Sequence, residues 1–194
     1  MVLRAETADD HARVDALVGQ AASVADPDGA RRFFTVMHAV VAAYRTALDR
    51  ASVLAGLEPR SALLLDALRF DLAELGAEPP SIPGAIDQAD DAAALGVGYV
   101  LEGSALGASV LREQAKAASM PLGYLSILDD NRPTRWPAFS SGLNAFAANH
   151  LAADGVGIEA TKQVAAVEAA RHVFLRVEAE LVSVLEVEPD VGVA

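Results

Sequence analysis

Apolar residues recur along this chain at spacings of three and four positions, in blocks long enough to form several turns of helix. This spacing is the period of an amphipathic α-helix. Alanine and leucine dominate the blocks, whereas β-branched residues are scattered. The pattern therefore predicts an all-α fold, with helices from the N-cap Thr7 through Val18 and over residues 30–50, 61–76, 90–118, 137–152 and 158–186.

Proline and turn-forming residues interrupt this pattern twice. Pro79 and Pro80 follow the third helix and set a boundary near Gly76. The stretch from Pro121 to Pro137 contains the run DDNRP, which is typical of a turn. We therefore expect this stretch to be irregular, with one short helix before the run.

The fourth expected helix, over residues 90–118, is unusual because it keeps four glycines in its interior: Gly96, Gly98, Gly103 and Gly107. Each costs roughly 1 kcal/mol relative to alanine. Close packing between helices is the common use of such residues. Gly103 and Gly107 are four positions apart and share one face of the helix.

The length of 194 residues suits a single domain. We expect one helical domain over residues 1–187 and a frayed tail over residues 188–194. No internal repeat or low-complexity segment divides the chain.

The composition excludes several classes of function. A net charge of -12 has the wrong sign for binding nucleic acid or an anionic membrane surface. The chain has no cysteine, which excludes disulfides and thiolate metal sites and fits a reducing cytoplasm. It has no signal-like start and no uninterrupted apolar run of about 18 residues, so we expect a cytoplasmic protein without a membrane span.

Histidines are the remaining candidates for metal chemistry. Gly-rich phosphate loops, hydrolase elbows, HExxH and EF-hand patterns are absent from the sequence. The four histidines, His11, His38, His150 and His172, are too far apart in sequence for a local metal pair, and none has a glutamate three residues before it, as a carboxylate di-iron site requires. For the last three we expect ordinary core or surface imidazoles.

A single histidine facing a glycine-rich helix is a suitable arrangement for a flat macrocycle such as haem. The imidazole supplies one axial bond to the iron. On the opposite face, glycines let a helix backbone approach the porphyrin and leave room for a small ligand. By position alone, however, the favoured interpretation of His11 is an ordinary histidine near the edge of the protein. Tyr44, which could offer a distal hydroxyl, lies on an apolar stripe typical of a core.

Two segments resemble the haem oxygenase family. Residues 3–15 read LRAETADDHARVD, similar to the proximal helix of these enzymes, with His11 at the position of the iron ligand. Residues 99–111 read YVLEGSALGASVL, similar to their distal helix. The form is nearest to the bacterial branch associated with bacteriophytochromes. The resemblance implies a single-domain helical fold with haem held between a proximal helix and a glycine-containing distal helix.

The resemblance also assigns individual residues. It implies that Arg4 pairs with a haem propionate and that Gly103 and Gly107 touch the haem face. Ser104 stands where many members carry an aspartate that organises distal water, although serine is familiar in the bacteriophytochrome-type branch. Ala108 replaces a glycine, and its side chain could face the haem or pack away from it. Further basic propionate partners are common in the family around residues 136–146, where this chain offers only Arg132 and Arg135 nearby.

The function implied is haem degradation. Haem is then both substrate and cofactor, with His11 as iron ligand and Gly103, Ser104 and Gly107 on the catalytic side. O₂ and electrons from a separate reductase convert haem to biliverdin, CO and ferrous iron, and a bacteriophytochrome is the expected biliverdin acceptor.

Two other functions remain open from the sequence. One is a haem carrier or sensor that does not turn over, which Ser104, Ala108 and the few basic residues would suit. The other is a helical interaction module without a cofactor, in which the glycines serve packing and His11 is incidental.

Overall fold

The structure is a computed structural model that describes residues 2–81, 86, 90–154 and 156–186. In this part of the chain the regular elements are all helices, which confirms the all-α prediction. They are α1 Val2–Glu6, α2 Ala8–Ala21, α3 Pro27–Ala43, α4 Arg45–Leu54, α5 Ser61–Glu74, α6 Asp91–Gly103, α7 Ala105–Ala117, α8 Gly123–Asp154 and α9 Val156–Glu186. The expected tail over residues 188–194 lies outside the described residues.

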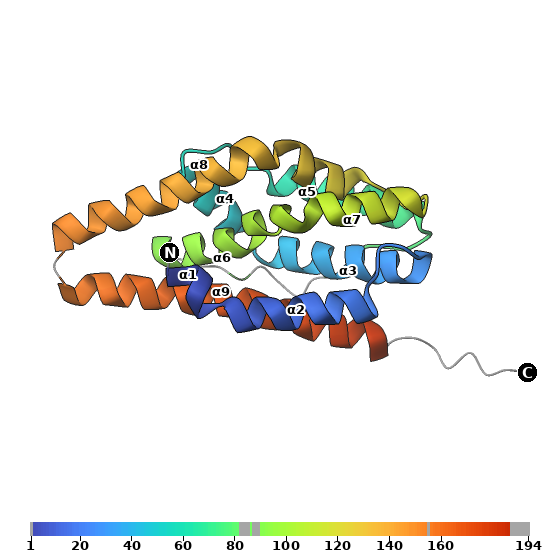
Figure 1. The fold of residues 1–194 in the computed structure, drawn as a ribbon, viewed down its shortest axis with the longest axis horizontal. Coiled ribbons are helices and arrows are strands. Elements are labelled where there is room, and N and C mark those ends of the chain that lie inside the picture. The colour runs from blue at the N-terminus through green and yellow to red at the C-terminus, as the bar shows by residue number, and fades with distance from the viewer. Residues whose placement is uncertain (1, 82–85, 87–89, 155, 187–194) are drawn as a thin grey trace, which may run out of the picture.

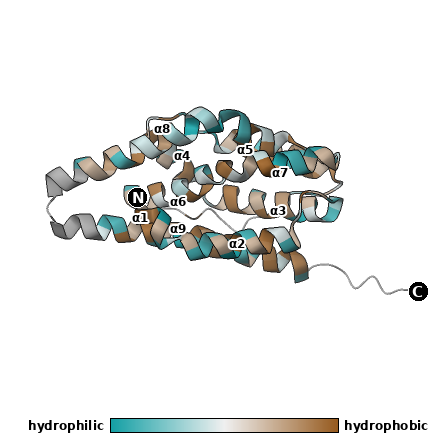
Figure 2. Ribbon diagram, viewed as in Figure 1, coloured by the Kyte–Doolittle hydropathy of each residue, from teal (hydrophilic) through white to brown (hydrophobic). Residues whose placement is uncertain are grey.

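The helices form layers around α3 and α6 (Figure 1). Helix α6 packs against α9 and α4, α3 packs against α5 and α9, and α7 packs along α8. Helix α2 lies along α9 at one edge of the bundle. In Figure 2 the hydrophobic colours gather on α3 and α6, in the middle of the bundle. Large fully buried side chains such as Phe34, Tyr44 and Tyr124 form the core between these helices.

The beginning of the chain differs from the prediction. Thr7 does not cap a helix with its side chain, because its hydroxyl donates to the Leu3 carbonyl oxygen at 2.7 Å. The residues before it form α1. Asp26 caps α3 by accepting from the Gly29 N–H at 2.8 Å, and Pro27 occupies the first helical turn.

Two predictions about the helices were wrong. The expected helix over residues 30–50 is two helices, α3 and α4, which meet at Tyr44. The expected irregular stretch between Pro121 and Pro137 is largely helical, because α8 runs through Pro133 and Pro137. Packing explains this second case: the α8 side chains that follow Pro133 pack on α6, which offsets two lost backbone hydrogen bonds.

Helices α6 and α7 together, Asp91–Ala117, are the one segment of the described chain that is long and apolar enough to cross a membrane by length and composition. Half of that window is buried inside the bundle. A core helix passes the same test, so its apolar composition is accounted for by burial.

Gly96 marks the closest approach between α6 and α9. A Cβ atom built on Gly96 would lie 2.1 Å from the carbonyl oxygen of Ala166. Gly19, in α2, has no atom within 4 Å of the same position. Gly96 is therefore a packing residue, whereas Gly19 is a helix-interior glycine without a packing role.

We expect Gly96→Ala to lower the free energy of unfolding by about 1–3 kcal/mol, because α6 must move away from the α9 backbone. The matched control Gly19→Ala should raise it by about 0.5–1 kcal/mol, because alanine is the better helix former. Urea denaturation of both variants measures these changes. Equal effects of the two substitutions would contradict the packing role.

His38 lies buried on α3 with 4% of its surface exposed. Neither ring nitrogen has a hydrogen-bond partner among the described residues. Burial, and to a lesser extent the charge of Arg69, lowers the pKa of His38 below its usual value. His38 is therefore a core histidine, one of the two ordinary roles that the sequence predicted. His172, which is exposed on α9, is a surface histidine.

This depressed pKa makes stability depend on pH. The unfolded chain takes up a proton at the ordinary histidine pKa of about 6.5, whereas the folded chain does so only at lower pH. His38 therefore costs stability as the pH falls from about 7 to about 5. We expect urea midpoints to fall less steeply over this range in His38→Leu than in the unsubstituted protein; parallel pH profiles would rule this out.

Candidate cofactor site

The expected distal helix is divided at Ser104. Helix α6 ends at Gly103 and α7 begins at Ala105, so a single helix over residues 90–118 was not the correct prediction. The Ser104 hydroxyl donates to the Leu101 carbonyl oxygen at 2.8 Å. The start of α6 was predicted correctly. The Asp90 side chain caps this helix by accepting from the N–H groups of Ala92 and Ala93.

The four glycines of this segment have different surroundings. Gly96 contacts the α9 backbone, and a Cβ on Gly98 would lie 2.6 Å from the Cβ of Ala51. These two glycines serve helix packing. Gly103 faces Trp136, whose ring would stand 3.4 Å from an added Cβ, an ordinary contact. Gly107 has nothing within 4 Å, so helix packing does not explain it.

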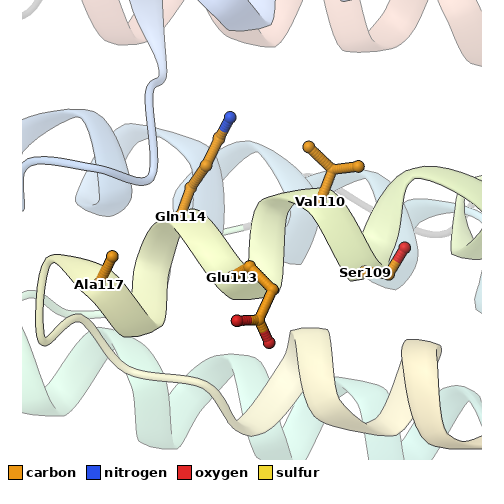
Figure 3. A pocket seen from close by; sticks show the side chains of 5 residues that line it. All are labelled: Ser109, Val110, Glu113, Gln114 and Ala117. Carbon is orange, nitrogen blue, oxygen red and sulfur yellow. The ribbon is translucent and has the colours of Figure 1, made fainter.

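Gly107 belongs to an exposed apolar face of α7. Leu106 and Val110 expose 52% and 61% of their surfaces. A cavity of about 620 Å³, wide open to solvent, is lined by Ser109, Val110, Glu113, Gln114 and Ala117. Figure 3 shows Val110, Gln114 and Ala117 projecting on one side of α7, and Glu113 on the other. Val110, Gln114 and Ala117 follow Gly103 and Gly107 at spacings of three and four residues, so these residues lie along one side of the helix. The hollow therefore continues the face that bears the two glycines.

His11 stands on α2 with 62% of its side chain exposed. Its Nδ1 atom lies 2.9 Å from Oδ2 of Asp15, one turn further along α2. Its ring meets that of Phe174 on α9 edge to face, with centroids 5.9 Å apart. Asp15 and Phe174 contact the imidazole on one side, and within the described part of the chain Nε2 takes part in no hydrogen bond or ion pair. A histidine held through one nitrogen in this way is suited to bind a metal through the other.

Ion pairs fix α2 against α9. Arg13 pairs with Glu178 at 3.1 Å. Arg171 pairs with Glu6 at 3.3 Å and with Asp10 at 3.6 Å. These contacts, together with the half-buried Val14, Leu17 and Val18 on the inner side of α2, determine how the helix is rotated about its axis.

The two halves of the candidate site come into register through Tyr99. Burial raises the pKa of this α6 residue, and the nearby Thr7 side chain and Arg4 charge partly offset that rise, so both residues lie close to Tyr99. Helices α1 and α2 run in the same direction as α6 and α7 (Figure 1). His11 lies four residues after Thr7, and Gly103 lies four residues after Tyr99, so equal helical rise brings His11 and Gly103 to the same level.

The basic residues near the site have different roles. Arg4 is exposed, and among the described residues no ion pair is recorded for it. Arg135 is fully engaged elsewhere, since it binds both carboxylate oxygens of Glu102, the Glu58 carbonyl and the Ser52 hydroxyl. Arg132 lies 3.3 Å from Asp129. Of these arginines, Arg4 is the one available for an anionic group.

Several predicted positions face the core. Ala108 exposes 1% of its surface and packs inward, which resolves the question about its direction. Tyr44 is buried at 2%, as expected for an apolar stripe. The half-buried Ser104 lies near Tyr124, whose pKa is strongly raised by burial. Ser104 therefore connects the break between α6 and α7 to the interior.

Sequence reasoning missed Asp15 and the buried pair of Glu102 with Arg60. Asp15 could have been found from its position four residues after His11 on the same helical face. Glu102 could have been noticed as a single charge within the apolar run of residues 92–108. No group of three or more potential metal ligands occurs among the described His, Asp and Glu residues. A metal at this site would therefore need a partner such as a macrocycle.

Comparison with known proteins gives a match among solved structures. No model of a protein family matches the chain, and no curated protein matches it in sequence. Among solved structures, the haem oxygenase of Neisseria meningitidis, in its NO- and CO-bound forms, superposes with a TM-score of 0.76. The match covers 97% of this chain and 92% of that chain, at 24% sequence identity.

The chain has the haem oxygenase fold. This confirms the predicted architecture from one end of the described helices to the other. At this sequence identity the match establishes the fold, and function must be argued from the site.

Proposed function

We propose that this protein is a haem oxygenase that converts haem, with O₂ and electrons, to biliverdin, CO and ferrous iron. The observation that carries the proposal is Gly107: a Cβ there would point into open space, on an apolar helix face one turn beyond the level of His11 and next to the hollow that begins at Ser109. A helix-interior glycine without a packing neighbour and an exposed apolar face are both accounted for if a flat ligand covers them.

His11 is the proposed iron ligand. Nδ1 of His11 is held by Asp15, so Nε2 is the nitrogen that would bind the iron. Phe174 limits rotation of the ring. When bound, haem supplies the iron that activates O₂ and the ring that is opened.

The face of α7 opposite His11 leaves space for O₂ and, with haem bound, shields it from bulk water. Gly107 presents backbone to the haem face, Gly103 borders that face beside Trp136, and Leu106 and Val110 add apolar surface. Arg4 binds a propionate carboxylate at the end of the site where α1 meets Tyr99. The proposed proton path runs through Ser104, whose hydroxyl must turn from the Leu101 carbonyl oxygen toward the haem face to act.

The proposed partners follow from this chemistry. The chain carries no flavin or iron–sulfur motif, so electrons come from a separate reductase. We assign the protein to the bacteriophytochrome-associated branch on the basis of the EGS and LGA sequences around Gly103 and Gly107, with a bacteriophytochrome as biliverdin acceptor. A cytoplasmic location suits these partners.

A haem carrier or sensor is the second candidate. It is favoured by Ser104, whose hydroxyl donates to the Leu101 carbonyl oxygen and not toward the hollow. The third candidate, a cofactor-free interaction module, would use the exposed apolar face of α7 to bind a partner.

Incubation of the purified protein with haem, a reductase system and O₂ separates these candidates. A haem oxygenase loses the Soret band while a biliverdin spectrum and CO appear. A stable oxygenated haem spectrum would favour the carrier, and failure to bind haem at micromolar concentration would favour the interaction module.

We expect His11→Ala to abolish turnover, because the axial bond that anchors the iron is lost. The matched control His172→Ala removes an exposed imidazole on α9 and should leave haem spectra and turnover unchanged. Absorption and EPR spectra of the ferric complexes measure axial ligation. An unaltered ligand signature in His11→Ala would show that another residue binds the iron.

Gly107→Leu should separate stability from function. Without haem it should be more stable by about 0.5–1 kcal/mol, because a helix-interior glycine is replaced in open space. Haem affinity should fall by at least about tenfold, because the new side chain occupies the site of the porphyrin. Gly19→Leu, the control, should gain similar stability and keep its haem affinity; equal affinity in both variants would place haem elsewhere.

A further inference from the structure

A buried cluster of charges lies directly behind the break between α6 and α7. Glu102, 2% exposed, accepts from Arg60 Nη2 at 2.5 Å and from Arg135 Nη2 at 2.7 Å. Arg60 precedes α5 and is 8% exposed, and Arg135 comes from α8. Three separate segments of the chain thus bring their charges to one place.

The charges in this cluster do not cancel. Two guanidinium groups face one carboxylate, so the cluster carries an excess of one positive charge. Arg135 directs its other donors to Ser52 and the Glu58 carbonyl, which are uncharged acceptors. The Nε and Nη1 atoms of Arg60 are buried and have no acceptor among the described residues. A buried guanidinium with unused donors acts on its surroundings with little screening.

The position of the cluster directs this field toward the candidate site. Glu102 is the residue immediately before Gly103, and Trp136, which follows Arg135 on α8, is the side chain that faces Gly103. The cluster therefore lies beside the start of the glycine face. Tyr124, 1% exposed, lies near Ser104 and close enough to Arg60 and Glu102 to sense their charges.

We propose that the excess positive charge of the Arg60–Glu102–Arg135 cluster strengthens the binding of small anions to the haem iron on the α7 side. This inference rests on the proposed function, because it requires haem between α2 and α7. The ligand class is a compact monovalent anion, and a neutral ligand of similar size gains nothing from the cluster. The cluster acts at a distance, so its residues set ligand preference without touching the ligand.

A purely structural role makes a different prediction. If the cluster only held α5, α6 and α8 together, removing either charge would weaken all ligands in the same direction. If the excess charge matters, removing a positive charge and removing the negative charge must have opposite effects on anions.

Azide binding to the ferric haem complex and CO binding to the ferrous complex test the proposal. Across one helix diameter, about 10 Å, one buried unit of charge changes anion affinity by about tenfold. Arg60→Met should therefore weaken azide binding by about tenfold, and Glu102→Gln should strengthen it by a similar factor. CO affinity should change by less than about twofold in both variants, because CO is uncharged.

Two further variants keep the test decisive. The double variant Arg60→Met with Glu102→Gln loses one charge of each sign and keeps the positive charge of Arg135, so it should bind azide like the unsubstituted protein. Arg112→Met removes a partly exposed α7 arginine that pairs with Asp129 and Asp130 at the surface, and should leave azide affinity unchanged because that charge is screened.

The outcomes distinguish this inference from the proposed function. Opposite azide shifts in the two single variants, or an unshifted double variant where a single variant does not fold, support the inference. Shifts in the same direction, or equal changes in azide and CO affinity, overturn it while leaving haem binding intact. Absence of haem binding by the unsubstituted protein overturns both.

Discussion

The candidate site depends on the glycine-rich segment from Gly96 to Gly107, which is tightly packed at its beginning and exposed to solvent at its end. At Gly96 and Gly98, α6 meets α9, α4 and α8 at distances that no side chain would allow. After Ser104 the chain continues as α7, which packs on α8 with one face and leaves Leu106, Gly107 and Val110 uncovered. The tight contacts of α6 fix the position from which α7 starts, and thereby the place of the open hollow.

The uncovered face has a cost in the free protein, because exposed apolar side chains and a helix-interior glycine both lower stability. A ligand that binds only the folded chain would offset this cost. The opposing helix α2 is arranged for the same guest: ion pairs to α9 hold it in place, and Asp15 with Phe174 orients His11. Helix α2 is therefore held on α9 and helix α7 on α8, while each helix also has a face toward the proposed haem site.

Much of this could be read from the sequence, where period and local chemistry agree. The all-helical class, the start of a helix near residue 90 and the end of the third helix near Gly76 all followed from local rules. The path of α8 through two prolines did not, because contacts of its side chains with Glu102 and Gly103 outweigh the local preference. Local rules also could not distinguish Gly96 from Gly107, since that difference lies in which helix stands opposite.

The most direct test of the account is a crystal structure of the protein with haem bound. It should show the porphyrin between α2 and α7, the iron bonded to Nε2 of His11, and the ring face against the backbone at Gly107. A porphyrin bound elsewhere, or a bound state in which His11 stays in solvent with Gly107 uncovered, would contradict it.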